Sequence, residues 1–262
     1  MICLILAAGY ATRMYPLTEN FPKPLLKVGD NTIIDWLIDD MESTGKVSKY
    51  VVVSNHKFID KFQKWHSESK LKDKIVILDD GSTENDNRLG AVKDIAFVIN
   101  ELSIEDDLMV LAGDNLLEFS LQKFVDYFYE KQATCVMRYF EEDVARLRKT
   151  GVATVDENDK ITKMVEKPQE PESNWAIPPF YIYCKDNISK IQKGIDEGCP
   201  TDAPGNFIAW LSDNTEVYTY VMPGKRFDIG SYTCLSQTSN IFFEISHYAS
   251  SLFFVEIVYK FL

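Results

Sequence analysis

The sequence of 262 residues lacks several patterns that identify common classes of protein. It contains neither a G-x-x-x-x-G-K-[ST] string nor a G-x-G-x-x-G string, so neither a P-loop kinase nor a nicotinamide-dependent enzyme is supported. Its five cysteines are scattered and none belongs to a C-x-x-C pair, which argues against a zinc site or a disulfide framework. We interpret them as small buried residues of a reducing compartment.

Positive charge is also scarce. The chain has 28 Lys and Arg residues against 40 Asp and Glu residues, and its formal net charge is −12. Because binding to a nucleic acid depends on neutralising backbone phosphates with Lys and Arg, we expect no nucleic-acid partner. A small phosphorylated substrate is still allowed, since a few local cations can overcome a negative surface field within a cleft.

Long apolar runs occur at the two ends of the chain. Residues 2–8 follow no basic segment and lead into a glycine-containing turn, so they are interpreted as a strand and the protein is expected in the cytoplasm. Residues 241–262 are strongly apolar, but Glu244, Glu256 and Lys260 interrupt them, which disfavours a membrane span. We expect a tail helix packed on the domain or at a homo-oligomer interface, with attachment to a membrane surface as the alternative.

Strand and helix patterns alternate along the first 112 residues. Apolar runs predict strands at residues 2–8, 50–54, 75–78 and 107–112, and helical spacing predicts helices at residues 32–43, 57–69 and 89–102. This order predicts right-handed crossovers and an α/β fold with a doubly wound, mostly parallel, Rossmann-like sheet.

The second half of the chain predicts a different pattern. Strands are expected at residues 135–139, 151–155, 160–166, 180–184 and 217–222, and helices at residues 121–129, 188–197 and 206–211. The DEND string at residues 156–159 joins two of these strands as a hairpin, so we expect antiparallel additions to the main sheet. No convincing linker divides the chain, and residues 1–240 are expected to form a single domain.

The loop after the first strand is the strongest functional signal. It places small residues and backbone N–H groups directly behind the strand, where amides can approach phosphate oxygens. Arg13 and Lys23 add positive charge to the same anion. Taken alone, the pattern favours phosphate binding only slightly, because small residues are common in any turn of an α/β protein.

The string LAAGYATRMYPLTENFPKPLL, which begins at Leu6, closely resembles the opening motif of the sugar-phosphate nucleotidyltransferase family. That family includes glucose-1-phosphate thymidylyltransferases and uridylyltransferases. In the family the second glycine of the loop stands where this chain has Ala11, a departure that reduces backbone freedom.

The resemblance continues at four later places in the same order, which is stronger evidence than any one motif. The string LAGDN around Asp114 is similar to the family's strand-end motif with a metal-binding aspartate. Gly151 resembles the glycine that lies against the sugar ring, and VEKP around Glu166 resembles the E-K-P motif. FDIGS around Asp228 is similar to the motif that supplies a second metal-binding aspartate. Each aspartate taken alone could equally cap a helix or stabilise a turn.

The resemblance implies a set of site residues. The nucleotide is expected to contact Leu6, Ala7, Ala8, Gly9, Tyr10, Ala11, Thr12, Arg13 and Gly90. Side chains of Ser82, Asn85 or Asn87 could add contacts to the base. The sugar phosphate is expected to contact Gly151, Glu166 and Lys167, the catalytic cations to be Arg13, Lys23 and Lys167, and Mg²⁺ to bind Asp114 and Asp228.

The implied reaction transfers a nucleoside monophosphate from a nucleoside triphosphate to a sugar 1-phosphate and releases pyrophosphate. A cytidylyltransferase acting on a phosphoalcohol such as phosphocholine is the alternative enzyme, and Trp175, Phe180, Tyr181 and Trp210 could supply an aromatic box for its ammonium group. A non-catalytic regulatory or scaffold relative is the alternative of another class.

Overall fold

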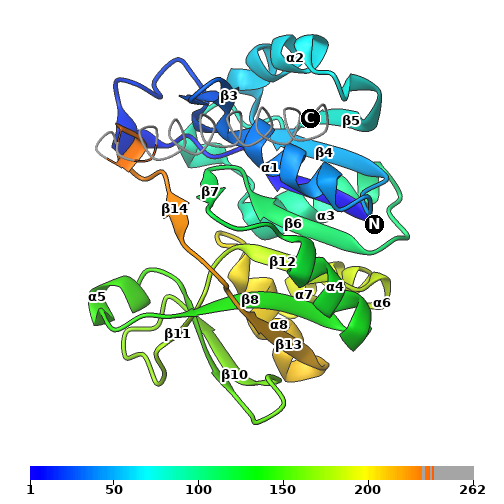
Figure 1. Ribbon diagram of the computed structural model, residues 1–262, viewed down its shortest axis with the longest axis vertical. Helices are drawn as coiled ribbons and strands as arrows, with labels where there is room; N and C mark the ends of the chain where they lie inside the picture. The colour runs from blue at the N-terminus through cyan, green and yellow to red at the C-terminus, as the bar shows by residue number, and fades with distance from the viewer. Residues whose placement is uncertain (232–233, 237, 239–262) are drawn as a thin grey trace, which may run out of the picture.

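A central mixed sheet covered by helices on both faces forms the protein (Figure 1). The computed structural model describes residues 1–231, 234–236 and 238. Within these residues ten strands form the sheet, namely β1 (Ile2–Leu6), β4 (Lys49–Ser54), β5 (Ile75–Asp79), β6 (Leu108–Ala112), β8 (Thr134–Phe140), β9 (Gly151–Val155), β10 (Ile161–Glu166), β11 (Trp175–Ile177), β12 (Phe180–Tyr183) and β13 (Val217–Val221). The tail predicted at residues 241–262 lies outside the described residues.

The parallel part of the sheet has the strand order β5-β4-β1-β6. In its centre Leu4 lies opposite Val51 on one side and Val110 on the other, and all three side chains are fully buried. Strands that are covered on both faces have continuous apolar sequences, which explains why the sequence pattern predicts them.

The strand order reverses between β1 and β6. From β1 the chain proceeds outward to β4 and β5, and then crosses back to place β6 on the opposite side of β1. In open α/β sheets, ligands bind outside the carboxyl ends of the strands at such a reversal. The loop after Leu6 and the residues after Ala112 therefore lie at the position where a site is expected.

The antiparallel part of the sheet begins at β12, which pairs with β6 and with β8. Beyond β8 follow β11, β9 and β10 in antiparallel pairings, and β13 pairs in parallel with β8. The predicted α/β class, with a doubly wound sheet that receives antiparallel additions, is confirmed.

Helices cover the two faces of the sheet. On one face lie α1 (Ile33–Ser43), α2 (Ile59–Glu68) and α4 (Gln122–Lys131); on the other lie α3 (Ala91–Glu101), α6 (Lys185–Ile188), α7 (Ile191–Asp196) and α8 (Gly205–Asn214). A short helix, α5 (Val144–Leu147), lies at the end of the antiparallel part. No helix in the described part of the chain combines the length and apolar character that crossing a membrane requires.

Several short strands have no counterpart in the sequence prediction. They are β11 in the main sheet and two separate ladders, β2 (Lys27–Val28) with β3 (Asn31–Thr32) and β7 (Asn115–Leu117) with β14 (Arg226–Asp228). Strands of two or three residues are too short to show a repeating pattern. The pairing of β14 with β7 nevertheless decides the geometry of the candidate site.

Candidate active site at the carboxyl ends of the strands

The loop that follows β1 is held at its base by backbone and amide hydrogen bonds. The carbonyl of Leu6 accepts a hydrogen bond of 3.0 Å from the backbone N–H of Gly113. The buried side chain of Asn55 donates to the carbonyl of Ala8 at 3.0 Å. Gly9 lies exposed above this base. The predicted nucleotide-binding loop therefore has its backbone fixed while its tip faces solvent.

The second part of the same loop contains a strained position. Tyr10 is buried and its hydroxyl donates to Ser82 Oγ at 3.4 Å. Ala11 has φ 48° and ψ 40°, the left-handed conformation, and its carbonyl accepts from Thr18 Oγ1 at 2.8 Å. The family's glycine at this position has a physical reason, since glycine adopts this conformation without steric cost. Arg13 follows in a 3₁₀ turn and is exposed.

Three predicted site residues meet at the strand-order reversal. Lys23 is buried, and its Nζ lies 2.8 Å from Asp114 Oδ2 and 3.7 Å from Asp228 Oδ1. We call these three residues the Lys23 cluster. Arg226 Nη1 also lies 3.8 Å from Asp228 Oδ2, so two cations balance the two carboxylates, and the aspartates remain partly exposed. The Lys23 cluster therefore presents carboxylate oxygens to the solvent side of the sheet edge.

The β14 strand delivers Asp228 to this cluster (Figure 1, orange). Asp228 pairs with Asn115, and the backbone N–H of Ile229 donates to the Asp114 carbonyl at 3.1 Å. Asn115 donates to Asp114 Oδ1 at 2.7 Å and accepts from Arg226 Nη1 at 2.6 Å. Asn115 stands in the LAGDN string but was assigned no role from the sequence, and Arg226, directly before the FDIGS string, was missed.

A second group of predicted residues gathers at β9 and β10. We call Gly151, Glu166 and Lys167 the Glu166 cluster. Gly151 pairs with Glu166 across the two strands, and a Cβ at Gly151 would approach Glu166 Oε2 to 3.0 Å. Lys167 directly follows β10 and has φ 49°, and its backbone N–H donates to the Thr150 carbonyl at 3.0 Å. A Cβ at Gly151 would come still closer to Met164 Cε, at 2.6 Å, so the absence of a side chain at Gly151 leaves space for both Met164 and the Glu166 carboxylate.

The charge of Glu166 is poorly solvated. Burial raises the pKa of this carboxyl to about 7, and although Lys167 lowers the pKa its effect is smaller. The Lys167 ammonium lies 3.3 Å from Asp202 Oδ2. A carboxyl with a pKa near neutrality changes protonation with small changes in its surroundings, as functional carboxyls often do.

The two clusters lie along one edge of the sheet. The backbone N–H of Ala112, two residues before Asp114, donates to the Pro179 carbonyl at 3.3 Å. In the same short segment the Ile177 carbonyl accepts from Thr150 Oγ1 at 3.0 Å, next to Gly151. Residues 177–179 thus contact both the end of β6 and the start of β9, from which the two clusters extend.

The predicted base-contact segment packs on another part of the chain. Gly90 has φ 92°, and a Cβ there would overlap the Thr201 carbonyl oxygen. Behind it, Asp94 of α3 is buried, and its Oδ1 has no hydrogen-bond partner among the described residues. Burial and the charge of Asp80 raise the pKa of Asp94 to about 7. This acidic pair was not predicted, although an aspartate among the apolar residues of α3 was a visible signal.

The aromatic residues suggested for a choline site do not form one box. Trp175 lies under the guanidinium of Arg138, with 4.4 Å from its ring centroid to Cζ. Phe180 and Tyr181 are buried in the core on opposite faces of the sheet. Trp210 stacks on Phe207 with 5.9 Å between the ring centroids, and its Nε1 donates to Glu197 Oε2 at 3.2 Å. These four aromatic residues therefore do not together enclose an ammonium group.

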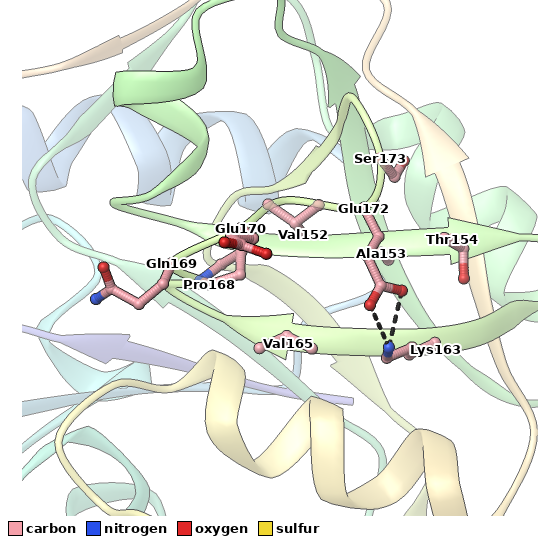
Figure 2. Close-up of a pocket in the computed structure, with 10 residues that line it drawn as sticks. All are labelled: Val152, Ala153, Thr154, Lys163, Val165, Pro168, Gln169, Glu170, Glu172 and Ser173. Atoms are coloured by element: carbon pink, nitrogen blue, oxygen red, sulfur yellow. Dashed lines mark hydrogen bonds and ion pairs between the residues drawn. The ribbon is translucent and has the colours of Figure 1, made fainter.

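A cavity of about 250 Å³ lies on the hairpin of β9 and β10, beside the Glu166 cluster (Figure 2). Val152 and Val165 contribute to its wall, and they alternate with Gly151 and Glu166 along β9 and β10. Successive residues of a strand point to opposite faces, so this cavity lies on the other side of the hairpin from the Glu166 carboxylate. It is not the candidate active site.

Comparison with known proteins agrees with this geometry. Residues 2–242 match the family model described as nucleotidyl transferase. The chain therefore belongs to the nucleotidyl transferase family. Its fold is shared with UDP-glucose pyrophosphorylase, solved in complex with UDP-glucose, at a TM-score of 0.77 and 20% identity over 93% of this chain and 98% of that chain.

Two relatives illustrate the range of the family. The chain is 27% identical over 252 residues to glucose-1-phosphate adenylyltransferase of Fervidobacterium nodosum, which corresponds to 91% of this chain and 60% of that protein. It is 29% identical over 183 residues to UTP–glucose-1-phosphate uridylyltransferase of Haloferax volcanii, which corresponds to 70% of this chain and 72% of that protein. The chain thus spans about three fifths of the length of the adenylyltransferase.

Proposed function

We propose that this protein transfers a nucleoside monophosphate from a nucleoside triphosphate to a sugar 1-phosphate, forming a nucleoside diphosphate sugar and pyrophosphate. The observation that carries the proposal is the meeting of Lys23 with Asp114 and Asp228 at the strand-order reversal. The position of the Glu166 cluster along the same edge and the names of the two relatives support a sugar phosphate as acceptor.

The chemistry requires charge neutralisation more than proton transfer. A phosphate oxygen of the acceptor attacks the α-phosphorus, and the bond from that phosphorus to the bridging oxygen breaks, so that both electrons leave with pyrophosphate. The acceptor phosphate is largely ionised at neutral pH, because its second pKa lies near 6. A general base is not needed, and positioning and electrostatic stabilisation supply the rate.

The cationic side chains of the site are assigned to different phosphate groups. The exposed Arg13 is assigned to the triphosphate, together with the backbone of residues 6–12. Lys23, held between two carboxylates, is assigned to the α-phosphate and to the incoming phosphate. Lys167 is assigned to the acceptor phosphate, and Glu166 to the sugar hydroxyls. Gly90, where the backbone is tightly packed, is assigned to the base.

The donor set of the Lys23 cluster fits Mg²⁺. Asp114 and Asp228 offer carboxylate oxygens, and Mg²⁺ is usually bound by one or two carboxylates together with substrate phosphates and water. When bound, the metal would neutralise charge on the phosphates. The two aspartates would hold it, and Lys23 would balance part of their charge before substrates arrive.

A substrate matrix tests the proposal. Several nucleoside triphosphates would be combined with sugar 1-phosphates and with phosphocholine, in the presence of Mg²⁺, and pyrophosphate release would be measured. We expect release with at least one sugar 1-phosphate and none with phosphocholine. Release with phosphocholine alone, or with no combination, would refute the assignment of the substrate class.

Replacing Asp114 with asparagine tests the role of the Lys23 cluster. The variant keeps the size of the side chain but removes the charge that the cluster uses in the transition state, so we expect turnover to fall about 10²- to 10³-fold. Asp213→Asn, at an exposed aspartate of α8, is the control and should keep wild-type turnover. Near-wild-type turnover of the Asp114 variant would contradict the assignment.

The proposal also covers the cellular compartment and the oligomeric state of the protein. All five cysteines are free, which supports a reducing compartment, and we place the enzyme in the cytoplasm. We retain a homo-oligomer as the state in solution because of the apolar sequence at residues 241–262. Light scattering at micromolar concentration tests it, and a monomer would count against it.

A further inference from the structure

Residues 201–205, between α7 and α8, contact both the base side and the acceptor side of the candidate site. We call them the 201–205 segment. At one end the Thr201 carbonyl accepts a hydrogen bond of 3.1 Å from the backbone N–H of Val92, at the start of α3. Gly90 packs so closely against the same carbonyl that any side chain would overlap it. This end of the segment is therefore anchored where the base is expected.

The middle of the 201–205 segment holds the acceptor lysine. Asp202 Oδ2 lies 3.3 Å from Lys167 Nζ, and Asp202 Oδ1 accepts a hydrogen bond of 2.9 Å from Asn206 Nδ2. The pairing with Lys167 lowers the pKa of Asp202 against the effect of its partial burial. Asp202 is thus a charged partner of Lys167, and the hydrogen bond from Asn206 of α8 sets the direction of the Asp202 side chain.

The far end of the segment shapes the position of Glu166. Gly205 begins α8, and a Cβ at this position would overlap Glu166 Oε2. Gly151 confines the same carboxylate from β9. The approach at Gly205 is the closer one, so the Glu166 carboxylate can keep this position only while residue 205 lacks a side chain.

We propose that the 201–205 segment is a positioning element: Asp202 directs Lys167, Gly205 leaves room for Glu166, and the Thr201 anchor fixes both relative to the nucleotide. This inference rests on the proposed function. In-line transfer depends on the relative placement of the two substrates, and small displacements are costly. A short segment that contacts the base side and both acceptor residues supplies that placement.

The ion pair between Asp202 and Lys167 contributes more to the orientation of the Lys167 side chain than to the free energy of folding. Its two side chains are about half exposed, and exposed pairs contribute little to the free energy of folding. A lysine side chain loses considerable rotamer freedom when it is held in one direction, and Asp202 imposes that restriction before the substrate binds. The loss of Asp202 should therefore weaken acceptor use without unfolding the protein.

Asp202→Asn tests this step. We expect kcat/KM for the sugar 1-phosphate to fall about tenfold. Without Asp202 the Lys167 side chain is free before the substrate binds, and it then loses its conformational entropy on binding. The KM for the nucleoside triphosphate and the melting temperature should stay at wild-type values. The matched control is Glu216→Gln, which breaks another exposed lysine–carboxylate pair, Lys160 with Glu216 at 3.0 Å. An equal effect in both variants, or none in Asp202→Asn, overturns the inference.

A size-compensation experiment tests Gly205. We expect Gly205→Ala to lower kcat/KM for the acceptor about tenfold or more, because the new methyl group displaces Glu166. The melting temperature should not fall, since alanine favours a helix over glycine. In a Glu166→Asp background the shorter side chain leaves space for the methyl group, so the added substitution should cost much less. Equal costs in the two backgrounds would refute a contact-based role.

Calorimetric titration with glucose 1-phosphate separates this inference from the proposed function. If the wild type releases no pyrophosphate but Asp202→Asn still binds glucose 1-phosphate more weakly than Glu216→Gln, the function fails and the positioning role stands. If the wild type is active and the two variants bind equally, only the positioning role fails. If the wild type neither binds nor turns over, both fail.

Discussion

Replacing Asp94 with asparagine should stabilise the protein, and by more at alkaline pH than at acidic pH. Asp94 is 6% exposed, and its Oδ1 has no hydrogen-bond partner within the described part of the chain. Burial is the main cause that raises its pKa, and the charge of Asp80 adds to it. An uncharged side chain of the same size removes the cost of ionising this position.

The magnitude follows from the two pKa values of Asp94. Its pKa is about 7 in the folded protein, against 3.8 for an ordinary aspartate. Between these values the folded state binds more protons than the unfolded state, so the free energy of unfolding falls as the pH rises. The cost reaches roughly 4 kcal/mol above pH 8, but only roughly 1.5 kcal/mol at pH 5. Asp94→Asn should therefore gain roughly 2.5 kcal/mol more at about pH 8.5 than at pH 5.

Urea unfolding of the wild type and the variant at both pH values measures this difference. Asp213→Asn, at an exposed position of α8, is the control and should change the free energy of unfolding little at either pH. An Asp94→Asn variant that gained no more stability at the higher pH than at the lower would show that Asp94 ionises in the fold at no cost. The reasoning from burial would then be refuted.

Two other positions give measurable expectations. Ala11→Gly should raise the free energy of unfolding by about 0.5 kcal/mol, because relief of the left-handed conformation exceeds the added entropy of glycine in the unfolded chain; a lower urea midpoint would contradict it. The KM for the sugar 1-phosphate should fall as the pH rises through about 7, because Glu166 ionises there and then accepts stronger hydrogen bonds from hydroxyls. Glu166→Gln should retain only the dependence due to the acceptor phosphate, and an unchanged pH profile in this variant would exclude Glu166 as its source.

Much of the part of the fold that is expected to bind the nucleotide was predictable, because its sequence patterns depend on neighbouring residues. Strands buried on both faces are continuous apolar runs, and the runs in β1, β4, β5 and β6 were located within a few residues. Asp114 directly follows one of these strands, and the carboxyl ends of parallel strands meet at one edge. Local pattern thus sufficed to predict that the loop after Leu6 and Asp114 would be neighbours.

The residues expected to bind the sugar phosphate were predicted from their motifs. The residues that hold them in position were not predicted. Glu166 and Lys167 stand in a recognisable string, whereas Asp202 and Gly205 follow a proline–threonine turn that has no distinctive pattern. Their importance comes from contacts with Lys167 and Glu166 across the fold. A contact between residues that are distant in the chain leaves no periodic signal at either end.

By itself the sequence determined the fold class and the order of strands and helices along the first half of the chain, because hydrophobic periodicity and turn chemistry act over a few neighbouring residues. The charged residues of the site were identified through the resemblance of their motifs to a known family. Only the tertiary structure decided which charges meet. Asp228 reaches Lys23 because β14 pairs with β7, and both strands are three residues long. Their pairing depends on the register of backbone hydrogen bonds between distant segments, and that register exists only once the sheet has formed.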